Sequence, residues 1–156
     1  MSENVKSIEQ VLKETGKYIG PTVGTSMLPM LKTRRDTIVV QAKTERLKPL
    51  DVALYMRDGK YILHRVLTVT KDGYIIRGDN CYFDEIVPEE TVIGVLTEFF
   101  RKKTHYFCTD EKYLAYARKR VKYYKSRRLF VLTWRKVVAG IKKPINWILR
   151  RDKRRK

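Results

Sequence analysis

The feature that most constrains this sequence is a series of short apolar segments interrupted by turns that contain an Asp-Gly pair. Two such pairs occur, at Asp58–Gly59 and at Asp72–Gly73. An Asp-Gly pair between apolar segments is a strong β-hairpin signal, because both residues accept the positive φ of a tight turn. We therefore expect residues 18–101 to form a meander of short strands, as a small barrel or curled sheet. The expected strands are residues 17–27, 36–42, 47–69 (two strands around the first turn), 74–77 and 91–101.

Helical patterns flank this strand region on both sides. Ser7 can cap the N-terminus of a short helix, Gln10 completes a capping box, and Gly16 ends the helix. After residue 109, apolar residues recur at steps of three and four, which is typical of a helix with one apolar face. A chain of 156 residues is long enough for one domain with a buried core.

The charge is divided unevenly along the chain. Residues 1–100 contain 14 Lys/Arg and 14 Asp/Glu, whereas residues 101–156 contain 21 Lys/Arg and 3 Asp/Glu, which accounts for the whole net charge of +18. A strongly basic segment is typical of binding to a polyanion, either anionic lipid or nucleic acid. We expect a neutral working domain over residues 1–108 and a basic helical tail over residues 109–156.

A serine and a histidine in the strand region could act together. Ser26 lies in the segment GTSMLPML, and His64 lies inside an apolar strand segment. A serine hydroxyl becomes a good nucleophile when a neighbouring base removes its proton, which histidine can do near neutral pH. A carboxylate can then orient the histidine, and acidic residues follow in the segment 79–85. Cys81 and Cys108 do not form a metal-binding set, so we interpret them as free thiols, and no metal or cofactor is implied.

Six segments of the chain, taken in order, resemble the type I signal peptidases and their relatives, the LexA-like self-cleaving repressors. They are GTSMLPML, RRDTIVV, LDVALY, ILHRVL, IIRGDN and VIGVL. The resemblance implies that Ser26 is the nucleophile and that His64 is the general base. Histidine at this place is similar to the endoplasmic-reticulum and archaeal enzymes, since the bacterial enzymes have lysine. For the acid the resemblance implies Asp79 first, with Asp84 and Glu85 as alternatives.

The same resemblance implies a fold and an activity. The fold would be α+β and mainly β, a small curled sheet or half-barrel of the LexA and signal peptidase type with flanking helices. The activity would be that of a serine endopeptidase that cleaves a peptide or protein substrate, such as a leader or secreted peptide, after a small residue. Two alternatives stay open: a repressor-like regulatory protein that cleaves itself, and a catalytically inactive scaffold that binds membranes.

The basic tail has the pattern of a helix that lies on a membrane surface. Its candidate membrane-binding residues are Phe130, Trp134, Ile141 and Trp147, with lysines and arginines between them. An anionic membrane surface is the first interpretation and packing against the domain is the second. Nucleic acid is the third, because no base-reading motif is present.

The sequence also predicts where this attachment takes place. The apolar runs near the C-terminus are far shorter than the ~20 residues that a spanning helix needs. The first 20 residues have no apolar segment of the kind found in signal peptides. We therefore expect peripheral attachment, on the cytoplasmic side of the membrane.

Overall fold

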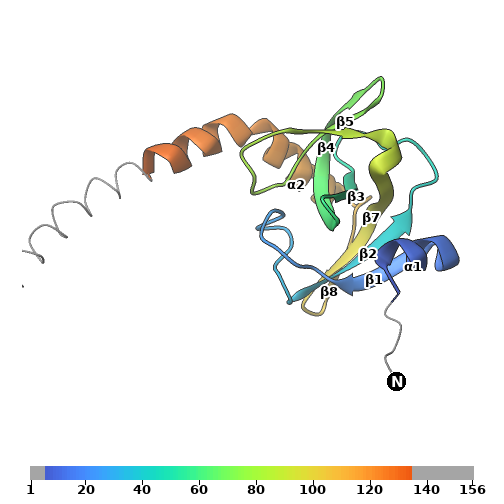
Figure 1. Ribbon diagram of the computed structural model, residues 1–156. Coiled ribbons are helices and arrows are strands. Elements are labelled where there is room, and N and C mark those ends of the chain that lie inside the picture. Colours follow the sequence, from blue (N-terminus) through green and yellow to red (C-terminus); the bar gives the residue numbers. More distant parts are fainter. Residues whose placement is uncertain (1–5, 135–156) are drawn as a thin grey trace, which may run out of the picture. The chain divides into compact units, whose positions relative to one another are not determined.

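The sheet expected from the sequence forms, and helices accompany it. The computed structural model describes residues 6–134 of the chain. Within these residues, eight antiparallel strands form one curled sheet, together with α1 (Ile8–Thr15), α2 (Glu111–Lys122) and the 3-10 helix η1 (Glu89–Thr91) (Figure 1). The prediction of an α+β class with a curled sheet is therefore confirmed.

Helix α1 begins and ends as its sequence predicts. The Ser7 side chain accepts a hydrogen bond from the Gln10 backbone, and the Gln10 side chain accepts one from the Ser7 backbone. Gly16 follows the helix in the left-handed conformation, with a φ of 72°. Leu12 is buried, and α1 contacts β1, β2 and β7. The capping box and the glycine stop thus fix a short helix against one face of the sheet.

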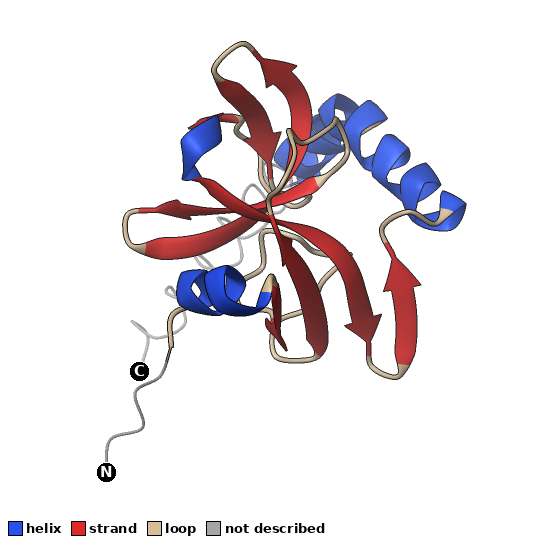
Figure 2. Ribbon diagram, turned by 90° about the vertical axis from the view of Figure 1, so that its right-hand side faces the viewer, coloured by secondary structure: helices blue, strands red, loops and turns tan. Residues whose placement is uncertain are grey.

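The order of the strands differs from a meander. In space the strands follow β1-β2-β7-β3-β4-β5-β6, with β8 paired to β7, and Figure 2 shows the curl of this sheet. Strand β7 lies between β2 and β3 because nine residues, 43–51, separate those two strands, too many for a tight hairpin. The strands are β1 (Lys17–Pro21), β2 (Asp36–Ala42), β3 (Val52–Arg57), β4 (Lys60–Thr70), β5 (Gly73–Arg77), β6 (Glu85–Pro88), β7 (Val92–Arg101) and β8 (Thr104–Phe107).

Both Asp-Gly pairs lie at hairpins, with different roles for their glycines. In the β3–β4 turn, Asp58 and Gly59 have φ values of 51° and 69°, as a tight hairpin turn requires. In the β4–β5 hairpin the turn lies one residue earlier than expected, and Gly73 is already the first residue of β5. A β-carbon on Gly73 would lie 2.2 Å from the carbonyl oxygen of Val87, so β6 can approach only a glycine there.

The segment after β1 is a loop rather than the strand expected up to residue 27. Strand β1 ends at Pro21, and the loop that follows is pinned by Asp36 at the start of β2. The backbone of Asp36 accepts a hydrogen bond from Thr22, and its buried carboxylate accepts one from the Lys32 backbone. The loop is thereby closed at its base, and it presents Ser26 at its outer part.

The buried side chains form two clusters. One contains Leu12, Val40, Leu54 and Phe99, and it includes Met27 from the serine loop. The other is built around residues of β3, β4 and β5. Because Met27 is 4% exposed, it packs in the core, and it anchors the residue next to Ser26.

A buried ion pair lies between β4 and the loop after β5. The Arg65 guanidinium donates to both carboxylate oxygens of Asp79, each at 2.9 Å, and both side chains are almost fully buried. Arg65 also donates to the Leu50 carbonyl and to the Tyr113 hydroxyl, and Tyr116 donates to Asp79. A buried ion pair is tolerated when further hydrogen bonds satisfy its remaining groups, as they do here.

We predict that Arg65→Ala lowers the free energy of unfolding by about 3–5 kcal/mol, because it leaves the Asp79 carboxylate buried without its cation. Urea unfolding followed by circular dichroism measures this loss. The matched control is Arg118→Ala, which removes an exposed arginine paired with Glu111 and should change the stability by less than ~1 kcal/mol. Equal effects of the two substitutions would contradict the role given to the buried pair.

Candidate active site

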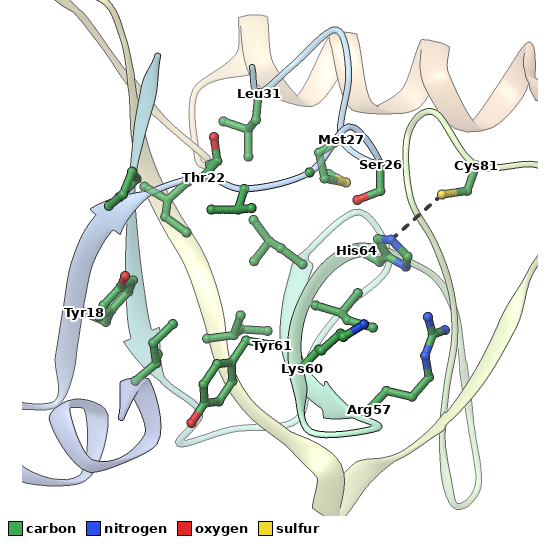
Figure 3. Close-up of a pocket in the computed structure, with 18 of the residues that line it drawn as sticks. Tyr18, Thr22, Ser26, Met27, Leu31, Arg57, Lys60, Tyr61, His64 and Cys81 are labelled. Carbon is green, nitrogen blue, oxygen red and sulfur yellow. Dashed lines mark hydrogen bonds between the residues drawn. The ribbon is translucent and has the colours of Figure 1, made fainter. Parts of the chain in front are cut away.

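A groove runs between β1 with its following loop and the first half of β4. Its volume is about 740 Å³, and most of its lining is apolar. Strand β4 pairs with β3 from Lys60 onward but with β5 only from Arg65 onward, so the stretch before Arg65 has one unpaired edge. Strand β1 is the terminal strand on the other side. Figure 3 shows Tyr18 on one wall of the groove, with Ser26 and His64 together at one end.

The His64 ring is held from its Nδ1 side by a tyrosine and a carboxylate. His64 Nδ1 lies 3.1 Å from the Tyr55 hydroxyl and 3.4 Å from Glu85 Oε1. The Tyr55 hydroxyl donates its proton to Glu85 Oε2 at 2.5 Å. Since Tyr55 has no second proton to give, both neighbours of Nδ1 are acceptors, and Nδ1 must carry the proton of the neutral ring. The lone pair of His64 then lies on Nε2.

The Nε2 side of the ring faces the serine loop. A β-carbon on Gly78 would lie 2.9 Å from His64 Nε2 and 2.8 Å from the Ser26 carbonyl oxygen. The two residues are therefore neighbours across Gly78, and the hydroxyl of Ser26 points into the groove beside the ring (Figure 3). The hydroxyl and the ring form no hydrogen bond. Nε2 instead contacts Cys81 Sγ, at 4.0 Å.

The Ser26 backbone is fixed by the loop that follows β5. The Asn80 backbone donates to the Ser26 carbonyl at 2.7 Å, and its side-chain amide donates to the Thr25 carbonyl at 3.2 Å. Within residues 6–134 the Ser26 N–H has no acceptor, so this donor is free to bind a ligand. The serine thus has a fixed backbone and an available N–H beside its own hydroxyl.

Burial and charge set the protonation of these groups. Burial lowers the pKa of His64, and the nearby Glu85 carboxylate opposes this by raising it. For Glu85, burial by itself raises the pKa, but hydrogen bonds from Tyr55 and Arg57 outweigh it and hold the pKa below its usual value. Burial, and then the bond to Glu85, raises the pKa of Tyr55. At neutral pH the set is therefore a neutral histidine, a neutral tyrosine and a carboxylate.

The structure separates the three acids that the sequence left open. Asp79, the first candidate, faces Arg65 with both carboxylate oxygens. Asp84 is half exposed and pairs with Arg77 at 2.7 Å. Glu85 is the acid whose carboxylate meets the His64 ring. The resemblance implied Asp79 first. In the structure Asp79 pairs with Arg65, and Glu85 is the acid that contacts His64.

Tyr55 was missed by the sequence analysis, although a signal for it was present. The Asp-Gly turn fixes the β3–β4 register, in which Arg57 pairs with Lys60 and Ala53 pairs with His64. Tyr55 is two residues from Ala53, so it lies on the same face and diagonal to His64. A hairpin register counted from the turn would have placed its hydroxyl beside the ring.

Comparisons with known proteins add no family to this geometry. No protein-family model matches the chain, and no curated protein matches it. Within the described residues, no group of three or more His, Cys, Asp and Glu side chains could hold a metal ion. Cys81 and Cys108 are free thiols. The chemistry of the site therefore depends on Ser26, His64 and their neighbours.

The tail residues named from the sequence are described in part. Phe130 and Trp134 are 66% and 60% exposed, and their rings stack with centroids 6.4 Å apart. Ile141 and Trp147 lie outside the described residues. In the part of the chain that the structure covers, none of the helices combines the length and the apolar character that crossing a bilayer requires.

We predict that Glu85→Gln lowers the pKa of His64 further, because it removes the negative charge that raises this pKa. The proton then leaves the imidazolium at a lower pH than in the unaltered protein, where the pKa already lies below 6.5. Titration of the imidazole proton signals by NMR measures the shift. The chain has two histidines, so His105 serves as an internal reference. Asp84→Asn is the matched control and should leave the pKa of His64 unchanged.

Proposed function

We propose that this chain is a serine endopeptidase of the signal peptidase type, with Ser26 as nucleophile and His64 as general base. The observation that carries the proposal is the orientation of the His64 ring. Its Nδ1 is occupied by two acceptors, which leaves the lone pair on Nε2, the ring nitrogen that lies across Gly78 from the Ser26 backbone. Burial lowers the pKa of His64, so the ring is neutral near neutral pH and its Nε2 lone pair is available to accept a proton.

The chemistry follows from these positions. His64 Nε2 takes the Ser26 hydroxyl proton as Oγ bonds to the carbonyl carbon of the substrate. The Ser26 N–H donates to the oxygen that becomes negative. The imidazolium formed on His64 is stabilised by the Glu85 carboxylate, directly and through Tyr55. Nε2 then gives its proton to the departing amine, and water frees the acyl group from Ser26 by the same steps.

The groove favours an extended peptide as substrate. Its walls are β1 with the following loop on one side and the unpaired edge of β4 on the other. An extended chain can add to such an edge through its backbone, while apolar side chains enter the lining. The resemblance adds cleavage after a small residue of a leader or secreted peptide. A self-cleaving repressor would use the same groove for a segment of its own chain.

Cys81 offers a second nucleophile, because its Sγ lies 4.0 Å from His64 Nε2. Its thiol is a poor candidate at neutral pH, since burial, and then the Glu85 charge, raises its pKa. The reactive form of cysteine is the thiolate, which this environment disfavours. Ser26 is therefore the nucleophile that the site supports best.

We predict that Ser26→Ala and His64→Ala each abolish peptide cleavage and labelling by a fluorophosphonate probe, while both proteins stay folded. Residues that act as one unit lose activity together, so the double variant should be no slower than either single variant within error. A peptide library made by digesting a proteome presents many different sequences at once, and mass spectrometry detects the new termini.

Cys81→Ala is the control for this experiment and should keep both cleavage and labelling. Retained labelling in Ser26→Ala, with loss in Cys81→Ala, would move the nucleophile to the cysteine. Cleavage of the protein's own chain in place of the library would favour the self-cleaving alternative. No labelling and no cleavage by the unaltered protein would favour the remaining alternative, a catalytically inactive scaffold that binds membranes.

We further propose that the C-terminal segment, residues 121–156, attaches the enzyme to an anionic membrane surface from the cytoplasmic side. In its described part, a helical stretch over residues 124–134 carries Phe130 and Trp134, which are exposed and four residues apart, so they lie on one side of that helix. The sequence after them, residues 135–156, contains ten Lys/Arg and one Asp. Exposed aromatic residues beside dense positive charge are typical of helices that lie in the headgroup region.

We predict that the full chain sediments with phosphatidylglycerol vesicles and much less with phosphatidylcholine vesicles. Raising the salt to ~1 M should weaken the charge-dependent part, since charges are then screened beyond about 3 Å. Phe130→Ala with Trp134→Ala should weaken the binding that salt leaves in place. Binding to duplex DNA instead of either vesicle would favour nucleic acid as the partner, and binding to neither would favour packing within the protein.

A further inference from the structure

One face of α2 contacts the scaffold of the candidate site. Tyr113, Tyr116 and Arg120 are spaced by three and four residues, so they share one side of the helix. Tyr113 accepts a hydrogen bond from Arg65, and Tyr116 donates one to Asp79. Arg120 contacts the loops on both sides of the site, and neither the ion pair nor the proposed chemistry explains why an arginine stands at this position.

The Arg120 guanidinium bridges two loops through one nitrogen. Its Nη2 donates to the Leu28 carbonyl at 3.3 Å and to the Asp79 carbonyl. Leu28 is two residues after Ser26, and Asp79 follows Gly78, the residue that separates Ser26 from His64. The same side chain thus holds the loop of the nucleophile and the loop that packs against the base.

These two loops also bind each other directly beside Ser26. The Asn80 backbone donates to the Ser26 carbonyl at 2.7 Å. Arg120 holds the residue before Asn80 on one loop and a residue after Ser26 on the other, so the hydrogen bond to Ser26 is fixed from both sides. Without Arg120, the hydrogen bond from Asn80 to Ser26 loses the contacts that fix the residues on either side of it.

Arg120 carries a cost that packing alone does not require. Its Nε is buried and has no hydrogen-bond partner within the described residues. A leucine or methionine would fill similar space without burying an unsatisfied N–H. The two carbonyl contacts are therefore the reason to have a guanidinium at this position.

We propose that Arg120 is a positioning residue for the peptidase reaction, which holds the loop that carries Ser26 against the loop that packs beside His64. The proposal rests on the proposed function. Arg120 touches neither substrate nor the reacting atoms, so its effect should appear in the rate of the chemical step. A misplacement of about 1 Å at a reacting group can lower a rate ~100-fold.

The test is a set of variants on α2, measured with a peptide that the unaltered enzyme cleaves. Arg120→Ala should lower kcat by about 10- to 100-fold and change KM by less than about twofold. Arg120→Lys should retain part of the kcat that Arg120→Ala loses, because both carbonyls accept from the single nitrogen Nη2 and a lysine ammonium also has several N–H donors on one nitrogen. The matched control, Arg118→Ala, removes an arginine from the exposed side of the same helix and should keep full activity.

Chemical rescue separates positioning from a merely structural role. Added guanidinium at millimolar concentration should restore part of the kcat of Arg120→Ala in a saturable way, and sodium chloride at the same ionic strength should not. Hydrogen exchange of residues 25–28 and 78–81 should rise in Arg120→Ala and stay unchanged in Arg118→Ala. Arg120→Gln provides a second variant in case the alanine protein does not fold.

The outcomes distinguish this proposal from the proposed function. An active parent enzyme with unchanged kcat in Arg120→Ala and Arg120→Gln overturns the positioning role and leaves the peptidase proposal intact. A rise in KM with constant kcat also overturns it, because it indicates a role in substrate binding. A parent protein that cleaves no peptide and reacts with no fluorophosphonate overturns the proposed function, and the positioning role falls with it.

Discussion

The ion pair between Arg65 and Asp79 joins the strand that carries His64 to the loop that faces it. Arg65 directly follows His64 in β4, and Asp79 directly follows Gly78. The ion pair between Arg65 and Asp79 therefore also fixes His64 against Gly78. Such a pair is stable in the interior only when its other donors and acceptors are satisfied. Leu50, Tyr113 and Tyr116 satisfy them, which explains why α2 belongs with the sheet up to Arg120. The position of the base thus depends on a contact between residues that take no part in its chemistry.

Three acids within seven residues have three different roles because their surroundings differ. Asp79 is buried against Arg65 and belongs to the scaffold, whereas Asp84 is an exposed partner of Arg77. Glu85 lies at an intermediate depth, where Tyr55 and Arg57 keep it charged beside His64. Glu85 differs from the other two because its carboxylate lies 3.4 Å from His64 Nδ1 and keeps its charge there.

Local signals in the sequence predicted local structure well. The capping box at Ser7, the Asp-Gly turn at Asp58 and the strand over 36–42 all form as expected. Long-range features were missed: the place of β7 between β2 and β3, and the strands β6 and β8. The choice among the acids was left open. A turn is encoded within four residues, whereas strand order and the partner of a buried charge depend on residues far along the chain.

Gly78 gives the molecule a simple marker. A β-carbon at this position would lie within 3 Å of Cys81 Sγ, the Ser26 carbonyl and His64 Nε2 at once, so the serine loop and the base can meet only across a residue without a side chain. With any other residue at this position, the Ser26 backbone, the His64 ring or the Cys81 side chain would have to move. The glycine therefore distinguishes a chain that keeps the arrangement from one that has kept only its reactive groups.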